Sequence, residues 1–552
     1  MKSNGHKARL FFLSAIFIVM WVVLIWRVLD LTILNRQFLK GQGDARSLRI
    51  MDMPAYRGMI TDREGAPLAV STPVQSVWMN PKDFKPTSQQ LTRLSQLLDS
   101  PKNDLSDKIK QAHQREFVYL KRQLPPETAA KIVNLKLPGL YLQQEFKRYY
   151  PEGDTTAQLL GFTNIDDNGI EGLELAYQDW LMGVPGQQRV LKDRTGRIIE
   201  GLGVLKEPHA GHDLVLSIDR RIQYIAYHEL QNTLAQFQAK SGSVIVVDTQ
   251  SGEILAAANA PAFNPNARDD YTRDSYRNKA FTDTFEPGSV IKAFTVASAL
   301  ESKQVTPTTV IDTRPSWMIV HGGTIRDVHN YGILDVTGVL EHSSNVGVTK
   351  ITLLSPPEQL IGLLHRAGFG SRTESGYPGE SEGTVVKVND ANPFVLATLS
   401  FGYGLSVSAI QLAQAYMVFA NQGVLRPVSL IHGQLASTGV QVISANTSNE
   451  VLAMLESVCN AGTGKAAQVP GYRVAGKTGT ARIAGKQGYE VHRYIGSFVG
   501  IAPVSNPRLV VVVIIQEPTH NGYYGAAVAA PLFKKVMAAS LRILDVIPDR
   551  TT

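Results

Sequence analysis

Ser289 and Lys292 form the first pair of residues whose types and spacing could do chemistry. They follow Pro287-Gly288 and open an apolar run, which predicts a helix that begins near Ser289. Because residues i and i+3 share a helix face, Lys292 would lie beside the Ser289 hydroxyl and could take its proton. A helix start would add free N–H groups at that oxygen. The pair therefore predicts a nucleophilic serine.

The Ser-x-x-Lys pattern alone also fits a plainer interpretation, an N-capping serine followed by a solvated lysine. A chain of 552 residues should contain the pattern about once by chance. The prediction therefore depends on other segments that could complete the site.

A second segment of interest is Lys477-Thr478-Gly479-Thr480, which follows an extended stretch. On a strand, Thr478 and Thr480 would share one face and Lys477 the other. Gly479 would let a ligand or another backbone approach closely. Two hydroxyls beside a lysine predict a carboxylate-binding strip, while an edge strand protected by its lysine is the alternative.

Between these segments lies Ser343-Ser344-Asn345, directly after a predicted helix over residues 336–342. Ser-x-Asn is weak by itself, and a second copy occurs at Ser444-Ala445-Asn446. That copy precedes a predicted helix over residues 449–458, so we interpret it as capping and turn residues.

The three motifs, in this order, resemble those of the class B penicillin-binding proteins, which are monofunctional peptidoglycan D,D-transpeptidases. Three further stretches also resemble family motifs: Arg57 to Gly65, Gly169 to Gly183, and Phe401 to Ser406. The resemblance covers nearly everything after the amino-terminal apolar segment. It implies a transpeptidase domain like that of the serine β-lactamases, standing on a β-rich pedestal domain.

The resemblance also implies a role for each site residue. Ser289 would be the nucleophile and Lys292 its base, while Ser343 and Lys477 would move a proton to the leaving amine. Asn345 would orient Lys292 and the donor peptide, and the backbone N–H groups of Ser289 and Thr480 would form the oxyanion hole. The substrate-binding residues would be Thr478, Gly479, Thr480, Ser344 and Tyr403.

The activity implied is cross-linking of stem peptides in the septal cell wall, through an acyl-enzyme and with release of D-Ala. The compact pedestal and the absence of C-terminal additions resemble the division-specific members. The implied partners are the stem peptides, β-lactams as covalent inhibitors, a membrane glycosyltransferase and other division proteins, with no cofactor. The alternatives are an elongation-type transpeptidase, a serine β-lactamase and a non-catalytic β-lactam sensor or scaffold.

The composition disfavours several other functions. The net charge of +7 is spread along the chain rather than gathered in one tract, which argues against nucleic-acid binding. Cys459 is the single cysteine, so a disulfide within the chain and a cysteine metal cage are excluded. We expect Cys459 to be buried. The twelve histidines show no HExxH or HxH spacing, so we predict no metal site.

The amino-terminal segment from Leu10 to Trp26 carries no charge and one polar residue, Ser14. At about 1.5 Å per residue it would span roughly 26 Å as a helix, and residues up to Leu34 could extend it. No small-residue cleavage site follows, which favours an uncleaved anchor over a signal peptide. The basic residues Lys2, Lys7 and Arg9 predict a cytoplasmic amino terminus and a periplasmic bulk, on a single pass through a bacterial inner membrane.

The elements expected after this anchor predict an α+β fold. Strands are expected over 243–248, 253–258, 493–502 and 509–515, and helices over 101–136, 220–238 and 530–544. One antiparallel sheet completed by both ends of the catalytic domain, with helices against it, would satisfy this order. The predicted domains are a cytoplasmic tail at 1–9, the anchor at 10–34, a pedestal at 35–212, the transpeptidase domain at 213–545 and a tail at 546–552.

Overall fold

The computed structural model describes residues 4–112, 114–193, 198–267, 273–434, 438–485 and 488–550. Lys2 and residues 194–196 of the predicted pedestal therefore lie outside the described residues, as do the last two residues of the predicted carboxyl-terminal tail. The chain divides into two compact units. The first comprises 1–56, 73–147 and 183–211, and the second comprises 57–72, 148–182 and 212–552. The predicted pedestal boundary at residue 212 stays a prediction.

The first unit begins with α1 (Asn4–Leu29), which leads into a short π-helical turn, η1 (Asp30–Leu34). The stretch His6–Leu34 contains an 18-residue window with a mean hydropathy of 2.5, and it is long and apolar enough to cross a membrane. Its apolar side chains are exposed, as a lipid-facing helix requires. The predicted anchor is thus matched by an amino-terminal apolar helix compatible with a single membrane span.

The rest of the first unit contains two small β assemblies. The strands β1 (Leu48–Met53), β6 (Gly186–Lys192) and β7 (Ile198–Lys206) form an antiparallel sheet that follows α2 (Arg36–Ser47). In the other, the end of β3 (Pro67–Met79) pairs with β4 (Val118–Leu124). The remaining elements are α3 (Ser88–Leu98), α4 (Lys102–Gln111), α5 (Pro126–Val133) and β5 (Leu140–Tyr149).

The helix predicted over residues 101–136 is wrong in its middle, because β4 separates α4 from α5. Leu120 and Leu124 of β4 are buried in the same apolar cluster as Leu94 and Leu98 of α3. Burial of these side chains, at about 1.5–3 kcal/mol each, outweighs the helical preference of the charged residues around them.

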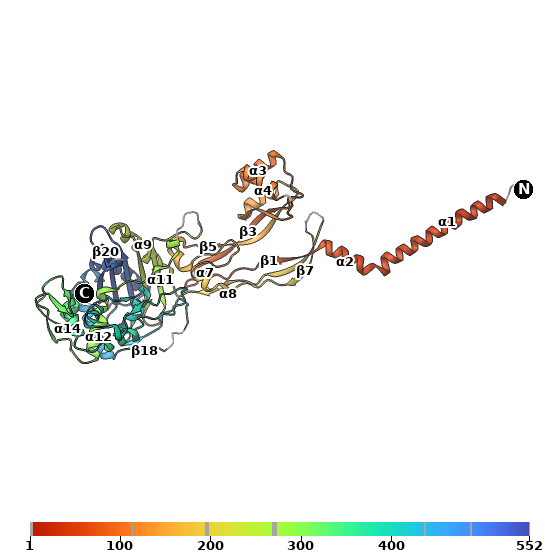
Figure 1. The fold of residues 1–552 in the computed structure, drawn as a ribbon. Helices are drawn as coiled ribbons and strands as arrows, with labels where there is room; N and C mark the ends of the chain where they lie inside the picture. Colours follow the sequence, from red (N-terminus) through yellow and green to blue (C-terminus); the bar gives the residue numbers. More distant parts are fainter. Residues whose placement is uncertain are drawn as a thin grey trace. The chain divides into compact units, whose positions relative to one another are not determined.

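The second unit is built on a five-stranded antiparallel sheet with the strand order β10-β9-β21-β20-β19. Figure 1 labels β20 of this sheet. Its strands are β9 (Ser241–Asp248), β10 (Ile254–Ala260), β19 (Ala475–Gly485), β20 (Gly488–Ala502) and β21 (Leu509–Gln516). The four predicted strands are confirmed, and so is the prediction that both ends of the domain complete one sheet. β19 is the last strand in this order.

Helices cover both faces of this sheet. On one face, α9 (Arg220–Phe237) and α20 (Ala530–Ile543) share an apolar cluster with Val511 and Val513 of β21. On the other, α12 (Lys292–Glu301) and α17 (Ala409–Ala420) share a cluster with Val510 and Val512. All residues of α17 are buried, including Gln411 and Gln414.

The remaining elements of the second unit surround these layers. The short strands are β2 (Ile60–Thr61), β8 (Leu214–Val215), β11 (Val310–Asp312), β12 (Trp317–Val320), β13 (Gly323–Arg326), β14 (Ile333–Asp335), β15 (Thr384–Val385), β16 (Leu405–Ser406), β17 (Val424–Leu425) and β18 (Val440–Gln441). The helices are α6 (Ala157–Leu160), α7 (Gly172–Ala176), α8 (Gln178–Leu181), α10 (Arg273–Tyr276), α11 (Lys279–Thr282), α13 (Val336–Glu341), α14 (Asn345–Thr352), α15 (Pro357–Arg366), α16 (Pro393–Leu399), α18 (Ala445–Asn460) and α19 (Gly525–Val528).

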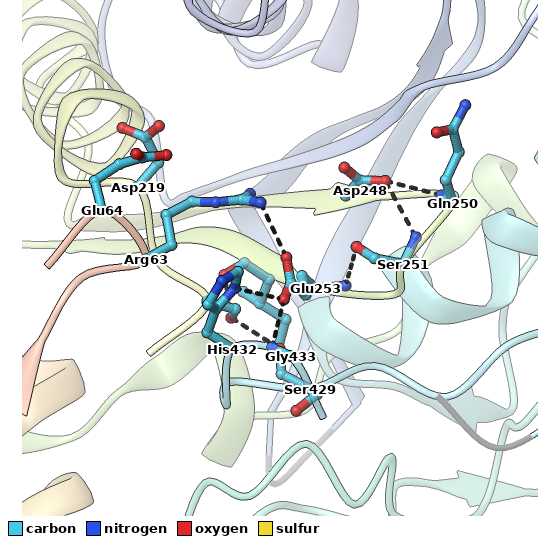
Figure 2. A network of polar contacts seen from close by, with 12 residues as sticks. Arg63, Glu64, Asp219, Asp248, Gln250, Ser251, Glu253, Ser429, His432 and Gly433 are labelled. Carbon is cyan, nitrogen blue, oxygen red and sulfur yellow. Dashed lines mark hydrogen bonds and ion pairs between the residues drawn. The ribbon is translucent and has the colours of Figure 1, made fainter. Parts of the chain in front are cut away.

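The segment 57–72 is tied to the catalytic body through Glu253, which Figure 2 shows at the centre of a polar network. The Glu253 carboxylate pairs with Arg63 at 3.2 Å and with His432 Nδ1 at 2.8 Å, and the Gly433 backbone N–H donates to it at 3.0 Å. Glu253 is buried, so these partners offset the cost of removing its charge from water. Arg63 of the 57–65 motif therefore serves a structural purpose.

A second buried charge cluster contains Arg57, the first residue of the 57–65 motif. Both carboxylate oxygens of Glu174 accept from arginines, Arg57 Nε at 2.7 Å and Arg148 Nε at 2.7 Å. These three side chains are almost completely buried. Nearby, burial raises the pKa of Asp167 to about 6. The cluster joins segments 57–72 and 148–182 inside the second unit.

Candidate active site

Ser289 lies in a 3₁₀ turn, η3 (Gly288–Ile291), that continues directly into α12. The predicted helix start is therefore confirmed. Gly288 has a φ of +61°, and a Cβ built on it would stand 3.2 Å from the carbonyl oxygen of Thr480. Any other residue would be strained by this φ and crowded by the Thr480 carbonyl. Glycine therefore allows the turn that carries Ser289 to pack directly against β19. Ser289 itself remains partly exposed.

The Lys292 side chain is fully buried and reaches the second motif. Its amino group donates to Asn345 Oδ1 at 2.7 Å, to Ser343 Oγ at 3.2 Å and to the Ser343 carbonyl oxygen. Two motifs more than fifty residues apart in the chain therefore meet at one amino group.

Lys477 reaches the same serine from the third motif. It is also fully buried, and its amino group donates to Ser343 Oγ at 3.0 Å. The Ser343 hydroxyl thus lies within hydrogen-bond distance of both lysines. Ser343 occupies the corner between α13 and α14 with a φ of +57°, a conformation uncommon for a residue with a side chain. Such local strain is typical of residues held in place for function.

The third motif forms β19, with Thr478 opposite Phe498, Gly479 opposite Ser497 and Thr480 opposite Gly496 on β20. This register confirms that Thr478 and Thr480 share a face. The Thr480 hydroxyl accepts from the Gly525 backbone N–H at 3.1 Å.

The other two residues of this strand segment also have close neighbours. Thr478 Oγ1 lies 2.9 Å from Thr463 Oγ1. A Cβ on Gly479 would lie 2.9 Å from the Pro287 carbonyl oxygen, so glycine is required where β19 meets the nucleophile turn.

Tyr403 belongs to a turn that packs against the nucleophile segment from another side. The Gly288 N–H donates to the Gly402 carbonyl at 3.2 Å, and Phe285 pairs with Val407 across an isolated bridge. The Tyr403 ring meets the Tyr489 ring edge-on at 5.3 Å. The sequence motif over residues 401–406 is therefore part of the wall behind the serine.

Glu286 is a residue of this wall that the sequence did not single out. Its Oε1 accepts from the Gly404 N–H at 3.0 Å and from the Tyr489 hydroxyl at 3.1 Å. One carboxylate thus links the nucleophile segment to two others, and no local pattern in the sequence marks such a long-range contact.

Asp327 is the second residue that the sequence did not reveal, and it fixes the Ser-Ser-Asn corner. It accepts from Ser344 Oγ at 2.6 Å, from the Val346 N–H at 3.0 Å and from the Asn345 N–H. Ser344 is buried and also caps α14 by accepting from the Gly347 N–H at 2.8 Å. We therefore interpret Ser344 as support for Asn345.

The electrostatics of the two lysines favour proton transfer near neutral pH. Burial lowers the pKa of Lys292 well below its usual value, and the neighbouring charge of Lys477 lowers it further, while Asp327 opposes the shift. Burial lowers the pKa of Lys477 to about 7. A lysine amine can act as a base only when neutral, so both downward shifts favour the form that can take a proton.

Comparisons with known proteins agree with this geometry. Residues 242–538, more than half of the chain, match the family model of the penicillin binding protein transpeptidase domain. Residues 52–216 match the model of the penicillin-binding protein dimerisation domain. The chain belongs to the class B penicillin-binding proteins. It is thus a member of a family of serine acyl-transfer enzymes.

Three members of the family cover between 61% and 96% of the chain. The peptidoglycan D,D-transpeptidase FtsI of Escherichia coli is 41% identical over 535 residues, which are 96% of this chain and 90% of the relative. A structure of the transpeptidase domain of Burkholderia pseudomallei penicillin-binding protein 3 covers 61% of this chain and 98% of its own, with 41% identity and a TM-score of 0.56. Mycobacterium tuberculosis penicillin-binding protein 3, complexed with aztreonam, covers 91% of this chain and 98% of its own, with 26% identity and a TM-score of 0.70.

Cys459 and Ser444, to which the sequence analysis gave no catalytic role, lie in structural positions. Cys459 is buried, as predicted, and burial raises the pKa of its thiol to about 12, which disfavours a nucleophilic thiolate. Ser444 of the second Ser-x-Asn copy caps α18 and accepts from the Thr447 N–H at 3.2 Å, as predicted. Within the described ranges, no group of three or more His, Cys, Asp or Glu residues could hold a metal ion.

Proposed function

We propose that the protein is a peptidoglycan D,D-transpeptidase that cross-links stem peptides of the septal wall during bacterial division. The observation that carries this proposal is the Ser343 hydroxyl within hydrogen-bond distance of the Lys292 and Lys477 amino groups, beside the turn that holds Ser289. This arrangement connects a base for the nucleophile to a proton donor for the leaving group. The name of the Escherichia coli relative gives the substrate.

Acylation begins when neutral Lys292 takes the proton of Ser289. The Ser289 oxygen attacks the carbonyl between the two terminal D-alanines of the donor peptide. Backbone N–H groups of Ser289 and Thr480 stabilise the oxygen anion, and loss of one such donor typically costs about 10²–10³ in rate. Asn345 holds Lys292 through the 2.7 Å hydrogen bond.

The C–N bond then breaks, and the departing D-Ala amine takes a proton from Ser343, which Lys477 resupplies. Thr478, Gly479 and Thr480 lie on the terminal strand of the sheet and bind the donor and its carboxylate. Tyr403 closes the site behind the serine. An amine of a second stem peptide attacks the acyl-enzyme and releases Ser289, and a β-lactam acylates the same oxygen as a slow substrate.

The apolar helix at the amino terminus supports a location in the inner membrane. Lys7 and Arg9 at the start of the span favour a cytoplasmic amino terminus and a periplasmic bulk. In this setting the partners are a glycosyltransferase that polymerises the glycan and other membrane proteins of division.

The lifetime of a fluorescent penicillin adduct tests this function against its rivals. The full chain in detergent should form a stable adduct, because a transpeptidase deacylates slowly. Ser289→Ala should abolish labelling, while Ser444→Ala, in the second Ser-x-Asn copy, should label normally. Release within seconds would indicate a β-lactamase, and a viable septum with Ser289→Ala would indicate a scaffold.

A further inference from the structure

Two stacked aromatic side chains, Tyr331 and His342, stand next to the proton-donating serine. Their ring centroids lie 4.9 Å apart with an angle of 26° between the planes. His342 directly precedes Ser343 and is exposed, and Tyr331 is partly exposed. The roles proposed above for the site residues leave this ring pair unused.

The segment that carries Tyr331 is held at both ends. At its start, Asp327 accepts from Ser344 Oγ at 2.6 Å, which ties it to the Ser-Ser-Asn corner. At its end, the Gly332 carbonyl accepts from the Thr313 N–H at 2.8 Å and from Thr313 Oγ1 at 2.7 Å. The ring pair is therefore fixed relative to Ser343, and an exposed apolar side chain, Val328, follows Asp327.

The chemistry of deacylation restricts where the second peptide can bind. The incoming amine must lose a proton as its bond to the acyl carbon forms. By microscopic reversibility, the group that protonated the leaving amine takes this proton. The amine must therefore approach on the Ser343 side. Lys292 is held there by Asn345 and Ser343, and Lys477 by Ser343. His342, which adjoins Ser343 in the chain, is exposed, so the ring pair offers a surface beside this serine.

We propose that Tyr331 and His342 form the acceptor-side wall of the site and pack against the alkyl arm that carries the amine of the second stem peptide. This inference rests on the proposed transpeptidase function. The N–C bond of the cross-link forms as the C–O bond to Ser289 breaks. The amine proton passes to Ser343 as Ser343 passes its own proton back to Lys477, and Ser289 regains its proton from Lys292. The two rings hold the amine in line with the acyl carbon. Holding two reacting groups in the right orientation accelerates their reaction.

The ratio in which one acyl-enzyme gives cross-linked and hydrolysed product tests the acceptor-side wall. The full chain is acylated with a D-alanyl thioester donor, in the presence of a blocked peptide that has one free side-chain amine. The ratio of cross-linked to hydrolysed product does not depend on the acylation rate, because both arise from the same intermediate. We expect Tyr331→Ala and His342→Ala each to lower this ratio at least five-fold, mainly through a higher half-saturating acceptor concentration. Tyr331→Phe should retain most of it.

The chain offers a matched control on α9. Tyr224 and His228 are also stacked, at 3.9 Å, and Tyr224 is 51% exposed. Tyr224→Ala should leave the ratio unchanged. An unchanged ratio in His342→Ala, an exposed substitution that keeps the fold, would overturn the inference, and so would an equal fall in Tyr224→Ala. If the wild-type chain forms no adduct on Ser289, the proposed function itself fails.

Discussion

At the scale of single residues, the site depends on two buried lysines that share one serine hydroxyl. Burying an amine costs free energy unless it becomes neutral, so the fold itself produces the base that the reaction needs. Lys292 and Lys477 are both completely buried, which lowers the pKa of each, and the charge of Lys477 lowers the pKa of Lys292 further. The sequence could predict this pair of residues from the motifs, but not the depth of their burial.

The first prediction concerns the pH dependence of the acylation rate, and specifically its acidic limb, where the rate falls as the pH falls. The charge of Lys477 lowers the pKa of Lys292, so Lys477→Met should raise that pKa and move the limb to higher pH. The rate itself should also fall, because Ser343 loses its proton source. Rates of penicillin acylation between pH 5 and 9 would measure this, and a limb that stays in place would contradict it.

The second prediction concerns Asp327, which fixes the corner without touching the substrate. Asp327→Ala should lower the acylation rate about 10–100-fold and the free energy of unfolding by about 1–3 kcal/mol, because buried donors lose their acceptor. Asp327→Asn, which keeps one acceptor, should lower the acylation rate and the free energy of unfolding by less. Asp312→Ala, at an exposed aspartate paired with Arg314, is the control and should behave like the wild type. Equal effects of Asp327→Ala and Asp312→Ala would refute this role.

At the scale of elements, long apolar runs were predictable and long-range polar contacts were not. Residues 509–515 are valine and isoleucine throughout apart from Leu509, and no exposed structure suits such a run, so β21 followed from composition. The stretch 101–136 misled because its charged residues suit a helix, while burial of Leu120 and Leu124 requires a strand. Asp327 and Glu286 carry no local signal, since their partners lie far away in the chain.

The third prediction concerns the joint between segments 57–72 and 148–182. Glu174→Gln should lower the free energy of unfolding by about 3–5 kcal/mol, because two buried guanidinium groups lose the charge that balances them. Glu229→Gln, which breaks a surface pair with Lys535, is the control and should change stability by less than about 1 kcal/mol. Denaturant unfolding of the two variants would compare them. A smaller loss for Glu174→Gln than for Glu229→Gln would exclude this account.

At the scale of the whole molecule, one apolar helix, a dimerisation-type region and a transpeptidase domain follow one another along the chain. Family membership was predictable from the three motifs in order, because the three together are far more specific than any one of them. The division into compact units was less predictable from the sequence, because it depends on contacts between distant segments. Buried ion pairs join residues 57–72 to residues 148–182, and Arg63 pairs with Glu253 in the rest of the second unit.

The fourth prediction concerns the orientation of the anchor. Alkaline phosphatase, which folds only outside the cytoplasm, should be active when fused after Thr552 and inactive when fused before α1. The basic residues Lys7 and Arg9 favour this orientation. Replacing both with glutamate should reduce the activity of the carboxyl-terminal fusion. An active amino-terminal fusion would reverse the assignment.

Mass spectrometry of the acylated protein tests the central claim most directly. After brief exposure of the full chain to benzylpenicillin and digestion, the added mass should lie on the peptide that contains Ser289. Adduct formation should disappear in Lys292→Met, whose fold can be checked by thermal unfolding. An adduct on any other serine, or undiminished acylation without the Lys292 amine, would contradict a lysine-activated serine at the start of α12.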